Sequence, residues 1–151
     1  MFAINDANLD QYPQNLALKS TATKHRDAIH CVTFHPEKRC LLTGADYKRI
    51  IAWDSDTLQP IHKYKGHKGV ISEICVIPGT DYVASASTDN TVKIWCLKTH
   101  KLIKTFQNHT ASARFIRLVP YLNGNIRYLC SGGDDGKICF YRWNIQAKKF
   151  E

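Results

Sequence analysis

The chain has 151 residues, of which 44% are hydrophobic and 23% are charged, and its formal net charge is +8. This composition excludes a disordered chain, which would hold fewer apolar residues. No apolar run approaches the ~18–20 residues that a membrane-spanning helix needs, and residues 1–18 lack the basic and apolar regions of a secretory signal. We therefore expect a folded domain of ordinary size that does not enter a membrane.

Residues 1–24 are polar and do not share the pattern of the rest of the chain. We interpret them as a flexible leader, and a strand near Leu16–Ser20 is compatible with that reading. The remaining residues contain short runs rich in β-branched and aromatic residues, bounded by Gly, Pro, Asn and Asp. Such runs are typical of an antiparallel meander.

Twelve strands are expected in three successive units. The first unit, residues 25–66, contains Ile29–Phe34, Cys40–Gly44, Ile50–Asp54 and Pro60–Tyr64. The second unit, residues 67–108, contains Val70–Val76, Tyr82–Ser87, Val92–Cys96 and Leu102–Phe106. The third unit, residues 109–151, contains Ala113–Val119, Tyr128–Ser131, Ile138–Trp143 and a last strand near Lys148–Glu151 that the chain end truncates. Its extra length fits a loop at Tyr121–Asn125, which has turn chemistry.

The units repeat with a constant register. His25, His67 and His109 are 42 residues apart, and Trp53 and Trp95 each follow the histidine of their unit by 28 residues. Stacked copies of one supersecondary element keep such a register, and a period of about 40–45 with a late Trp is typical of propeller blades. The sequence therefore predicts an all-β chain with about three four-stranded antiparallel blades.

The second unit resembles a WD40 repeat at Gly66-His67, Ser85–Asp89 and Val92–Trp95. The resemblance implies a partial WD40 β-propeller. It also implies a hydrogen-bonded chain through Trp95, Ser85, His67 and Asp89 that makes the blade rigid. The equivalent residues are His109, Ser131, Asp135 and Tyr141 in the third unit, and His25, Thr43 and Trp53 in the first. Because Tyr47 stands where the first unit should carry the aspartate, we expect a weaker network there.

Catalysis is not expected. His67, Ser85 and Asp89 could suggest a hydrolase, but no Gly-x-Ser-x-Gly loop accompanies them. We also expect no cofactor and no metal, since the spacing of His30, Cys31, His35 and Cys40 matches no zinc ligand set. The six cysteines form no Cys-x-x-Cys pair, which predicts free thiols in a reducing compartment.

A closer resemblance concerns Ile94–Thr99 and Arg127–Trp143, which are similar to the N-terminal propeller of bromodomain and WD-repeat proteins. That resemblance implies a nuclear, chromatin-associated regulator of transcription, with a role in cell shape and cytoskeletal organisation in some members. A cytoplasmic location is the alternative. The acetyl-lysine-reading bromodomains of that family are absent from this sequence, so no reader chemistry is assigned to it.

Some members of that family are substrate receptors of cullin-4 ubiquitin ligases and dock through a Trp-Asp-x-Arg element. The matching residues here are Trp95, Cys96, Leu97 and Lys98. The aspartate is absent, and lysine lacks the planar fork of arginine. Ligase docking is therefore an alternative that these residues weaken.

The positive charge is dispersed in groups of two or three residues. Dispersed lysines are typical of solvated strand edges and loop tips, so we disfavour direct nucleic-acid binding and keep it as a second alternative.

Three blades cannot close a ring, since propellers have four to eight. We therefore expect the chain to be part of a longer protein or to bind further blades in cis or in trans, and we interpret it as a scaffold that binds other proteins. Loop tips are the candidate docking positions, with ordinary turn residues as an equally good interpretation. These candidates are Arg26, Asp46, Lys68, Thr88, Thr110 and Asp134.

Overall fold

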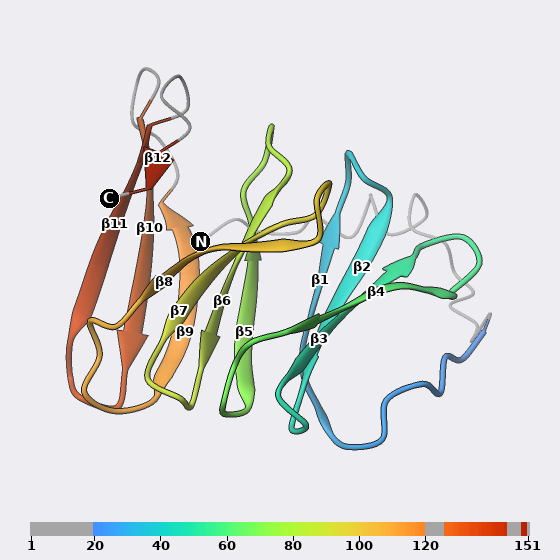
Figure 1. Cartoon of the computed structure of the whole chain (residues 1–151), viewed down its shortest axis with the longest axis horizontal. Helices are drawn as coiled ribbons and strands as arrows, with labels where there is room; N and C mark the ends of the chain where they lie inside the picture. Colours follow the sequence, from blue (N-terminus) through green and yellow to red (C-terminus); the bar gives the residue numbers. More distant parts are fainter. Residues whose placement is uncertain (1–19, 120–125, 145–148, 151) are drawn as a thin grey trace, which may run out of the picture.

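The computed structural model describes residues 20–119, 126–144 and 149–150. In these residues the chain forms three four-stranded antiparallel sheets, in the strand order β1-β2-β3-β4, β5-β6-β7-β8 and β9-β10-β11-β12 (Figure 1). The expected all-β arrangement of three four-stranded units is confirmed. The strands are β1 (Ile29–His35), β2 (Cys40–Ala45), β3 (Arg49–Asp54), β4 (Pro60–Lys65), β5 (Ile71–Val76), β6 (Tyr82–Ser87), β7 (Val92–Cys96), β8 (Lys101–Phe106), β9 (Ala113–Val119), β10 (Ile126–Gly133), β11 (Ile138–Asn144) and β12 (Lys149–Phe150).

Most strands begin and end within a residue of the expected positions. The exception is β10, which is longer at both ends than the run of apolar residues that predicted it. The Tyr121–Asn125 loop, and all but the last residue of the strand expected near Leu16–Ser20, lie outside the described residues. The limits of the three units derive from the sequence period alone and stay a prediction.

Apolar side chains hold the first and second sheets together. Leu42 and Ile50 of the first sheet belong to one buried cluster with Ile71, Val83 and Trp95 of the second. The same alternation places the other face of the second sheet against the third, where Ala84 and Ile94 share a cluster with residues of β9 to β11. Each sheet therefore buries the side chains of alternate positions against its neighbour, as the period-2 pattern requires.

Polar contacts also join the sheets. The Glu37 carboxylate accepts a hydrogen bond from the Gly79 backbone across 2.9 Å, which connects the β1–β2 turn to the β5–β6 turn. Between the second and third sheets, the Glu73 carboxylate accepts from the Ile116 backbone at 2.8 Å and pairs with Arg117. These contacts supplement the apolar clusters at both junctions.

The third sheet exposes a face whose counterpart in the second sheet is buried. By register, Ile138 and Phe140 of β11 correspond to Val92 and Ile94 of β7. Val92 and Ile94 are 1% and 0% exposed, whereas Ile138 and Phe140 are 71% and 66% exposed. The difference arises because the third sheet packs on the second with its other face.

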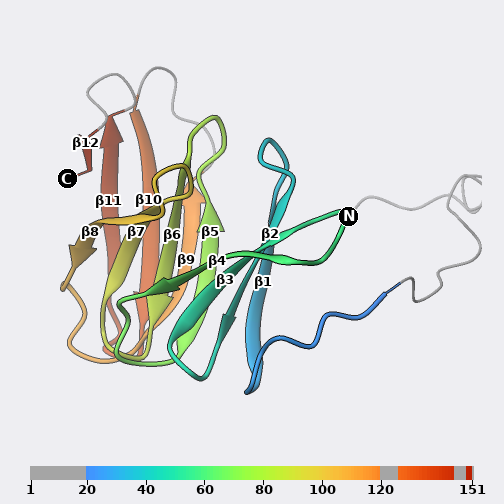
Figure 2. The same ribbon diagram turned by 45° about the vertical axis from the view of Figure 1, so that its right-hand side comes forward.

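The first sheet has a similar exposed face at the opposite end of the row of sheets (Figure 2). Val32 corresponds by register to Ile74 and Ile116, which are buried at the two junctions. Val32 is 66% exposed, and Phe34 beside it is 48% exposed. Both ends of the row thus carry apolar side chains that an additional sheet would cover.

All six cysteines carry free thiols. Burial raises the pKa of Cys31 and of Cys75 to about 11, so neither thiol ionises readily near neutral pH. In the described part of the chain, no helix is long and apolar enough to cross a membrane.

Candidate functional site

A continuous hydrogen-bonded chain crosses the second sheet. Trp95 Nε1 donates to Ser85 Oγ at 2.8 Å, and Ser85 Oγ lies 2.7 Å from Nε2 of His67. Nδ1 of His67 lies 2.8 Å from the Asp89 carboxylate, which also accepts from the Lys68 backbone at 2.7 Å. This arrangement joins β6 and β7 to the loop before β5 and to the β6–β7 turn, which lie at the same end of the strands.

The donors and acceptors fix the protonation of His67. Because the Asp89 carboxylate can only accept, the ring proton of His67 sits on Nδ1, and in the neutral ring Nε2 accepts the proton of the Ser85 hydroxyl. Burial lowers the pKa of His67, which favours this neutral ring. Burial alone would raise the pKa of Asp89, but hydrogen bonds from His67 and Thr91 hold it well below its usual value. Ser85 is fully buried, so its oxygen is not accessible to a substrate.

The third sheet contains the equivalent chain with tyrosine in place of tryptophan. The hydroxyl groups of Tyr141 and Ser131 lie 2.9 Å apart, and Ser131 lies 2.7 Å from Nε2 of His109. Nδ1 of His109 lies 3.0 Å from the Asp135 carboxylate, which accepts from the Thr110 backbone at 2.8 Å. The hydroxyl of tyrosine therefore replaces the indole N–H at nearly the same reach.

In the first sheet the chain stops short. Trp53 Nε1 donates to Thr43 Oγ1 at 2.8 Å, and Thr43 contacts Nε2 of His25. Nδ1 of His25 and the hydroxyl of Tyr47 are buried without a hydrogen-bond partner. The neighbouring Asp46 does not replace the missing carboxylate, because it pairs with His30 instead.

The six candidate docking residues lie at the same end of the strands. They are in the β2–β3, β6–β7 and β10–β11 turns and in the loops before β1, β5 and β9. Arg26, Lys68, Thr110 and Asp134 are exposed, while Asp46 and Thr88 are half-buried. Thr88 is half-buried because its hydroxyl oxygen accepts from the Val70 backbone at 2.9 Å. The Asp134 carboxylate pairs with Arg114 at the surface.

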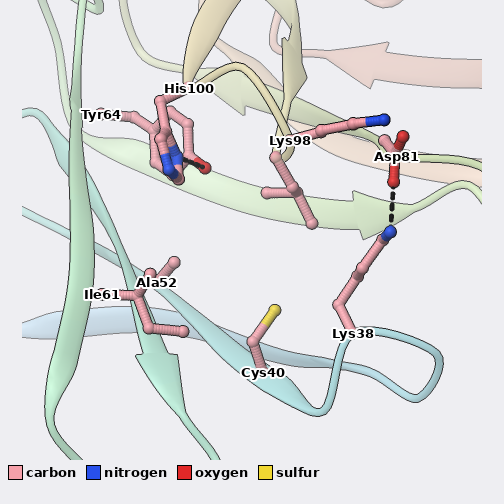
Figure 3. A pocket seen from close by; sticks show the side chains of 9 residues that line it. Lys38, Cys40, Ala52, Ile61, Tyr64, Asp81, Lys98 and His100 are labelled. Atoms are coloured by element: carbon pink, nitrogen blue, oxygen red, sulfur yellow. Dashed lines mark hydrogen bonds and ion pairs between the residues drawn. The ribbon is translucent and has the colours of Figure 1, made fainter.

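A cavity of about 290 Å³ lies between the first and second sheets, at the opposite end of the strands from the candidate docking residues (Figure 3). Ala52, Ile61 and Leu97 provide apolar walls. Lys38 of the β1–β2 turn pairs with Asp81 at its mouth, and the remaining lining residues are Cys40, Tyr64, Lys98 and His100.

His100 is held in this cavity by its neighbours. Its Nδ1 lies 3.2 Å from the Tyr64 hydroxyl, and its ring stacks on His62 with centroids 4.2 Å apart. Cys96 and Leu97 are buried beside it, so only Lys98 of the Trp95–Lys98 element is exposed. This cavity escapes sequence reasoning, because its walls come from residues up to 62 positions apart, from Lys38 to His100. Among the described residues, no group of three or more His, Cys, Asp or Glu side chains could hold a metal ion.

The repeats match a known family. The family model described as "WD domain, G-beta repeat" matches residues 17–54, 58–96 and 100–142. The chain belongs to the WD40 family. The second and third matched segments each combine the last strand of one sheet with the first three strands of the next, so these two sequence repeats are offset from the sheets by one strand.

Relatives of this WD40 chain have diverse names. It is 29% identical over 119 residues to the E3 ubiquitin-protein ligase COP1 of Arabidopsis thaliana, covering 78% of this chain and 17% of that protein. It is 32% identical over 90 residues to eukaryotic translation initiation factor 3 subunit I of Sclerotinia sclerotiorum, covering 60% and 27%. It is 29% identical over 85 residues to human WD repeat-containing protein 43, covering 56% and 12%. The WD40 chain thus spans less than a third of each of these relatives.

A solved structure shows the same fold. The structure of U3-55K matches 86% of this WD40 chain with a TM-score of 0.68 and 22% sequence identity, and the match covers 38% of that structure. At this identity the likeness concerns the fold, and the fold is a propeller of which this chain supplies about three blades.

Proposed function

We propose that the chain acts as a non-catalytic protein-interaction scaffold. The observation that carries this proposal is the pair of apolar sheet faces at the two ends of the row, around Val32 and around Phe140. Monomeric soluble proteins rarely expose large contiguous apolar patches unless the patches bind something. Because protein covers the equivalent positions at both internal junctions, the fitting occupants are further blades, in the same polypeptide or in another chain.

The absence of catalysis is part of this proposal. Of the groups that could resemble a hydrolase triad, His67 bonds to both Ser85 and Asp89, and Ser85 also accepts from the indole of Trp95. A nucleophile needs a free approach for its substrate, and the buried Ser85 has none. We infer that these hydrogen bonds stabilise the blade and that the protein transforms no substrate.

We propose further that the scaffold belongs to a nuclear, chromatin-associated regulator of transcription with an influence on cell shape. Support comes from Ile94–Thr99 and Arg127–Trp143, which are similar to bromodomain and WD-repeat proteins. The net charge of +8 suits surroundings rich in phosphate and acidic proteins.

Fractionation of cells that express the tagged chain tests this assignment. We expect it in the chromatin fraction, and we expect the double variant Ile138→Lys/Phe140→Lys to be released, because the variant loses an apolar binding face. The assignment would be refuted if the chain stayed in the cytoplasm, or if the double variant were retained on chromatin as well as the wild type.

Substrate reception for a cullin-4 ligase is a second candidate, favoured by the similarity to a protein named as a ubiquitin ligase. Only Lys98 of the docking element is exposed, and it cannot form a bidentate contact. If this candidate holds, Lys98→Arg strengthens binding to the ligase adaptor and Lys98→Ala abolishes it. Identical adaptor binding by both variants excludes it.

A further inference from the structure

A cavity of about 430 Å³ on the first sheet is lined almost entirely by cations. Its residues come from the segment before β1, the β2–β3 turn, the start of β3 and the end of β4. No carboxylate lines it. The lining residues are Lys24, Arg26, Tyr47, Arg49, Lys63 and Lys65.

The five cations of this cavity are not neutralised by the protein. Among the described residues, Lys38, Arg39, Arg114 and Arg117 each pair with a carboxylate, and none of the cavity's five cations does. Burial, and after it the charge of Lys63, lowers the pKa of the neighbouring His25. Like charges held together repel one another, and an anion that binds among them relieves that repulsion.

The second sheet lacks this cationic lining. The positions 42 residues further along the chain, which occupy the same places in the second sheet, hold one cation and one carboxylate. The repeat therefore does not require basic residues here. The second-sheet residues are Gly66, Lys68, Asp89, Thr91, Thr105 and Gln107.

A carboxylate is missing from this part of the first sheet. In the second sheet, Asp89 accepts from a histidine ring and from the Lys68 backbone, whereas the first sheet has Tyr47 at that position. Tyr47 and the adjoining His25 keep buried polar atoms without partners. Compared with the second sheet, the first sheet therefore lacks one carboxylate and has four more cations at the same place.

A neighbouring blade would not close the cavity. The second sheet is covered by the first on the equivalent face, yet the positions equivalent to the lining stay accessible. Gly66, Lys68 and Gln107 are exposed, and Thr91 and Thr105 are half-buried. A ligand could reach the cavity in a larger propeller as well.

From these observations we infer that the cavity binds a phosphorylated side chain of a protein partner. A phosphate monoester carries about −1.5 to −2 charges and three acceptor oxygens. Arg26 and Arg49 can offer bidentate forks, while Lys24, Lys63 and Lys65 add point charges. The volume falls in the usual range of ligand pockets, about 300–1,000 Å³. The inference rests on the proposed interaction role and adds the chemistry of the partner.

The lining favours a phosphorylated protein over a single-stranded nucleic acid. Single-stranded nucleic acids need aromatic platforms for their bases as well as cations for their backbone. The one aromatic ring of the lining, Tyr47, packs edge-on against His25 with centroids 5.4 Å apart and has its hydroxyl buried. The cations converge on one cavity, which suits a compact dianion.

Nuclear magnetic resonance titration of the isotope-labelled chain tests the inference. The probes are a seven-residue peptide with phosphoserine at the centre of six alanines, its unphosphorylated twin, inorganic phosphate and a hexamer of uridine. We expect saturable amide shifts at Tyr47 and Arg49 with the phosphopeptide and none with its twin. Lys63→Gln/Lys65→Gln should weaken phosphopeptide binding at least fivefold. The matched control Lys101→Gln/Lys137→Gln removes the same charge from exposed lysines elsewhere and should leave phosphopeptide binding unchanged.

Several outcomes would overturn the inference. Equal shifts with both peptides would remove the phosphate requirement, and equal weakening by the two double variants would reveal only non-specific attraction. Tighter binding of the uridine hexamer at Tyr47 and Arg49 would assign the cavity to nucleic acid. Inorganic phosphate that binds as tightly as the phosphopeptide would exclude a peptide site. The scaffold role is tested separately, by the chromatin retention of the Ile138→Lys/Phe140→Lys variant. A negative titration therefore refutes the phosphate site and does not refute the scaffold role.

Discussion

The indole nitrogen of Trp95 donates a hydrogen bond to the hydroxyl oxygen of Ser85 across 2.8 Å, in a part of the second sheet where both side chains are buried. The same hydroxyl bonds to His67, so one small oxygen joins two ring systems. Ser85→Ala would leave both rings without their partner, and an unsatisfied buried group costs about 1–3 kcal/mol. We expect the free energy of unfolding in urea to fall by about that amount.

Ser72→Ala is the control for this experiment. The Ser72 hydroxyl is buried without a hydrogen-bond partner in β5, so its removal should leave stability unchanged or raise it slightly. An equal loss of stability in both variants would show that the bonded chain contributes nothing beyond the packing of its atoms.

Acid should weaken the second sheet in two stages. Because burial lowers the pKa of His67, the unfolded state binds its proton first, and stability is lost as the pH falls below the ordinary histidine value of 6.5. The pKa of Asp89 is also lowered, so its contribution is present above the ordinary value of 3.8 and is lost as the pH falls through the lower folded-state value. Urea unfolding of the wild type and of Asp89→Asn between pH 7 and 2 measures both stages.

The gap in stability between the wild type and Asp89→Asn should persist above pH 3.8 and shrink as the pH falls below it. Asp56→Asn serves as a control, since Asp56 pairs with Arg39 at the exposed surface and such pairs contribute little. A gap that stays constant over the whole pH range would contradict the ionised carboxylate.

Gly69 is required by the close approach of two loops. A Cβ atom at Gly69 would lie 2.5 Å from Thr88 Oγ1 and 2.6 Å from the Asp89 backbone nitrogen. Gly69→Ala must displace the β6–β7 turn, and overpacking of this kind costs about 1–3 kcal/mol. Gly132→Ala, whose Cβ would meet only Phe115 at an ordinary 3.9 Å, should be tolerated. Thermal unfolding separates them, and equal melting temperatures would disprove the steric account.

Tyr47→Asp should repair the first sheet. The new carboxylate would occupy the position in the first sheet that Asp89 occupies in the second. There it would accept from His25, whose Nδ1 is buried without a partner. We expect a gain of about 1 kcal/mol in urea unfolding, the usual net value of one hydrogen bond. The same substitution should weaken phosphopeptide binding, because it adds a negative charge to the cationic cavity. A less stable protein would mean that the lost packing of Tyr47 outweighs the new bond.

The strands were predictable from the sequence because each unit repeats its apolar alternation at a fixed period. The hydrogen-bonded chain of Trp95 was expected from the resemblance to WD40 repeats and not from spacing alone, since Ser131 and Asp135 lie four residues further from their histidine than Ser85 and Asp89 do. The two cavities were not predictable. Lys24 and Lys65 look like dispersed surface charges in the sequence, and only the pairing of β3 with β4 and the path of the leading segment bring them together. The packing between sheets, which no local pattern encodes, sets the cavity around His100.

Sedimentation velocity of the isolated chain tests the scaffold account most directly. The account predicts complexes that grow with concentration, because the Ile138 and Phe140 face of one copy meets the Val32 and Phe34 face of another. It also predicts that Ile138→Lys/Phe140→Lys sediments as a folded monomer of 17.2 kDa. A wild-type chain that remains a monomer at every concentration tested, with both faces uncovered, would contradict the claim that these faces bind protein.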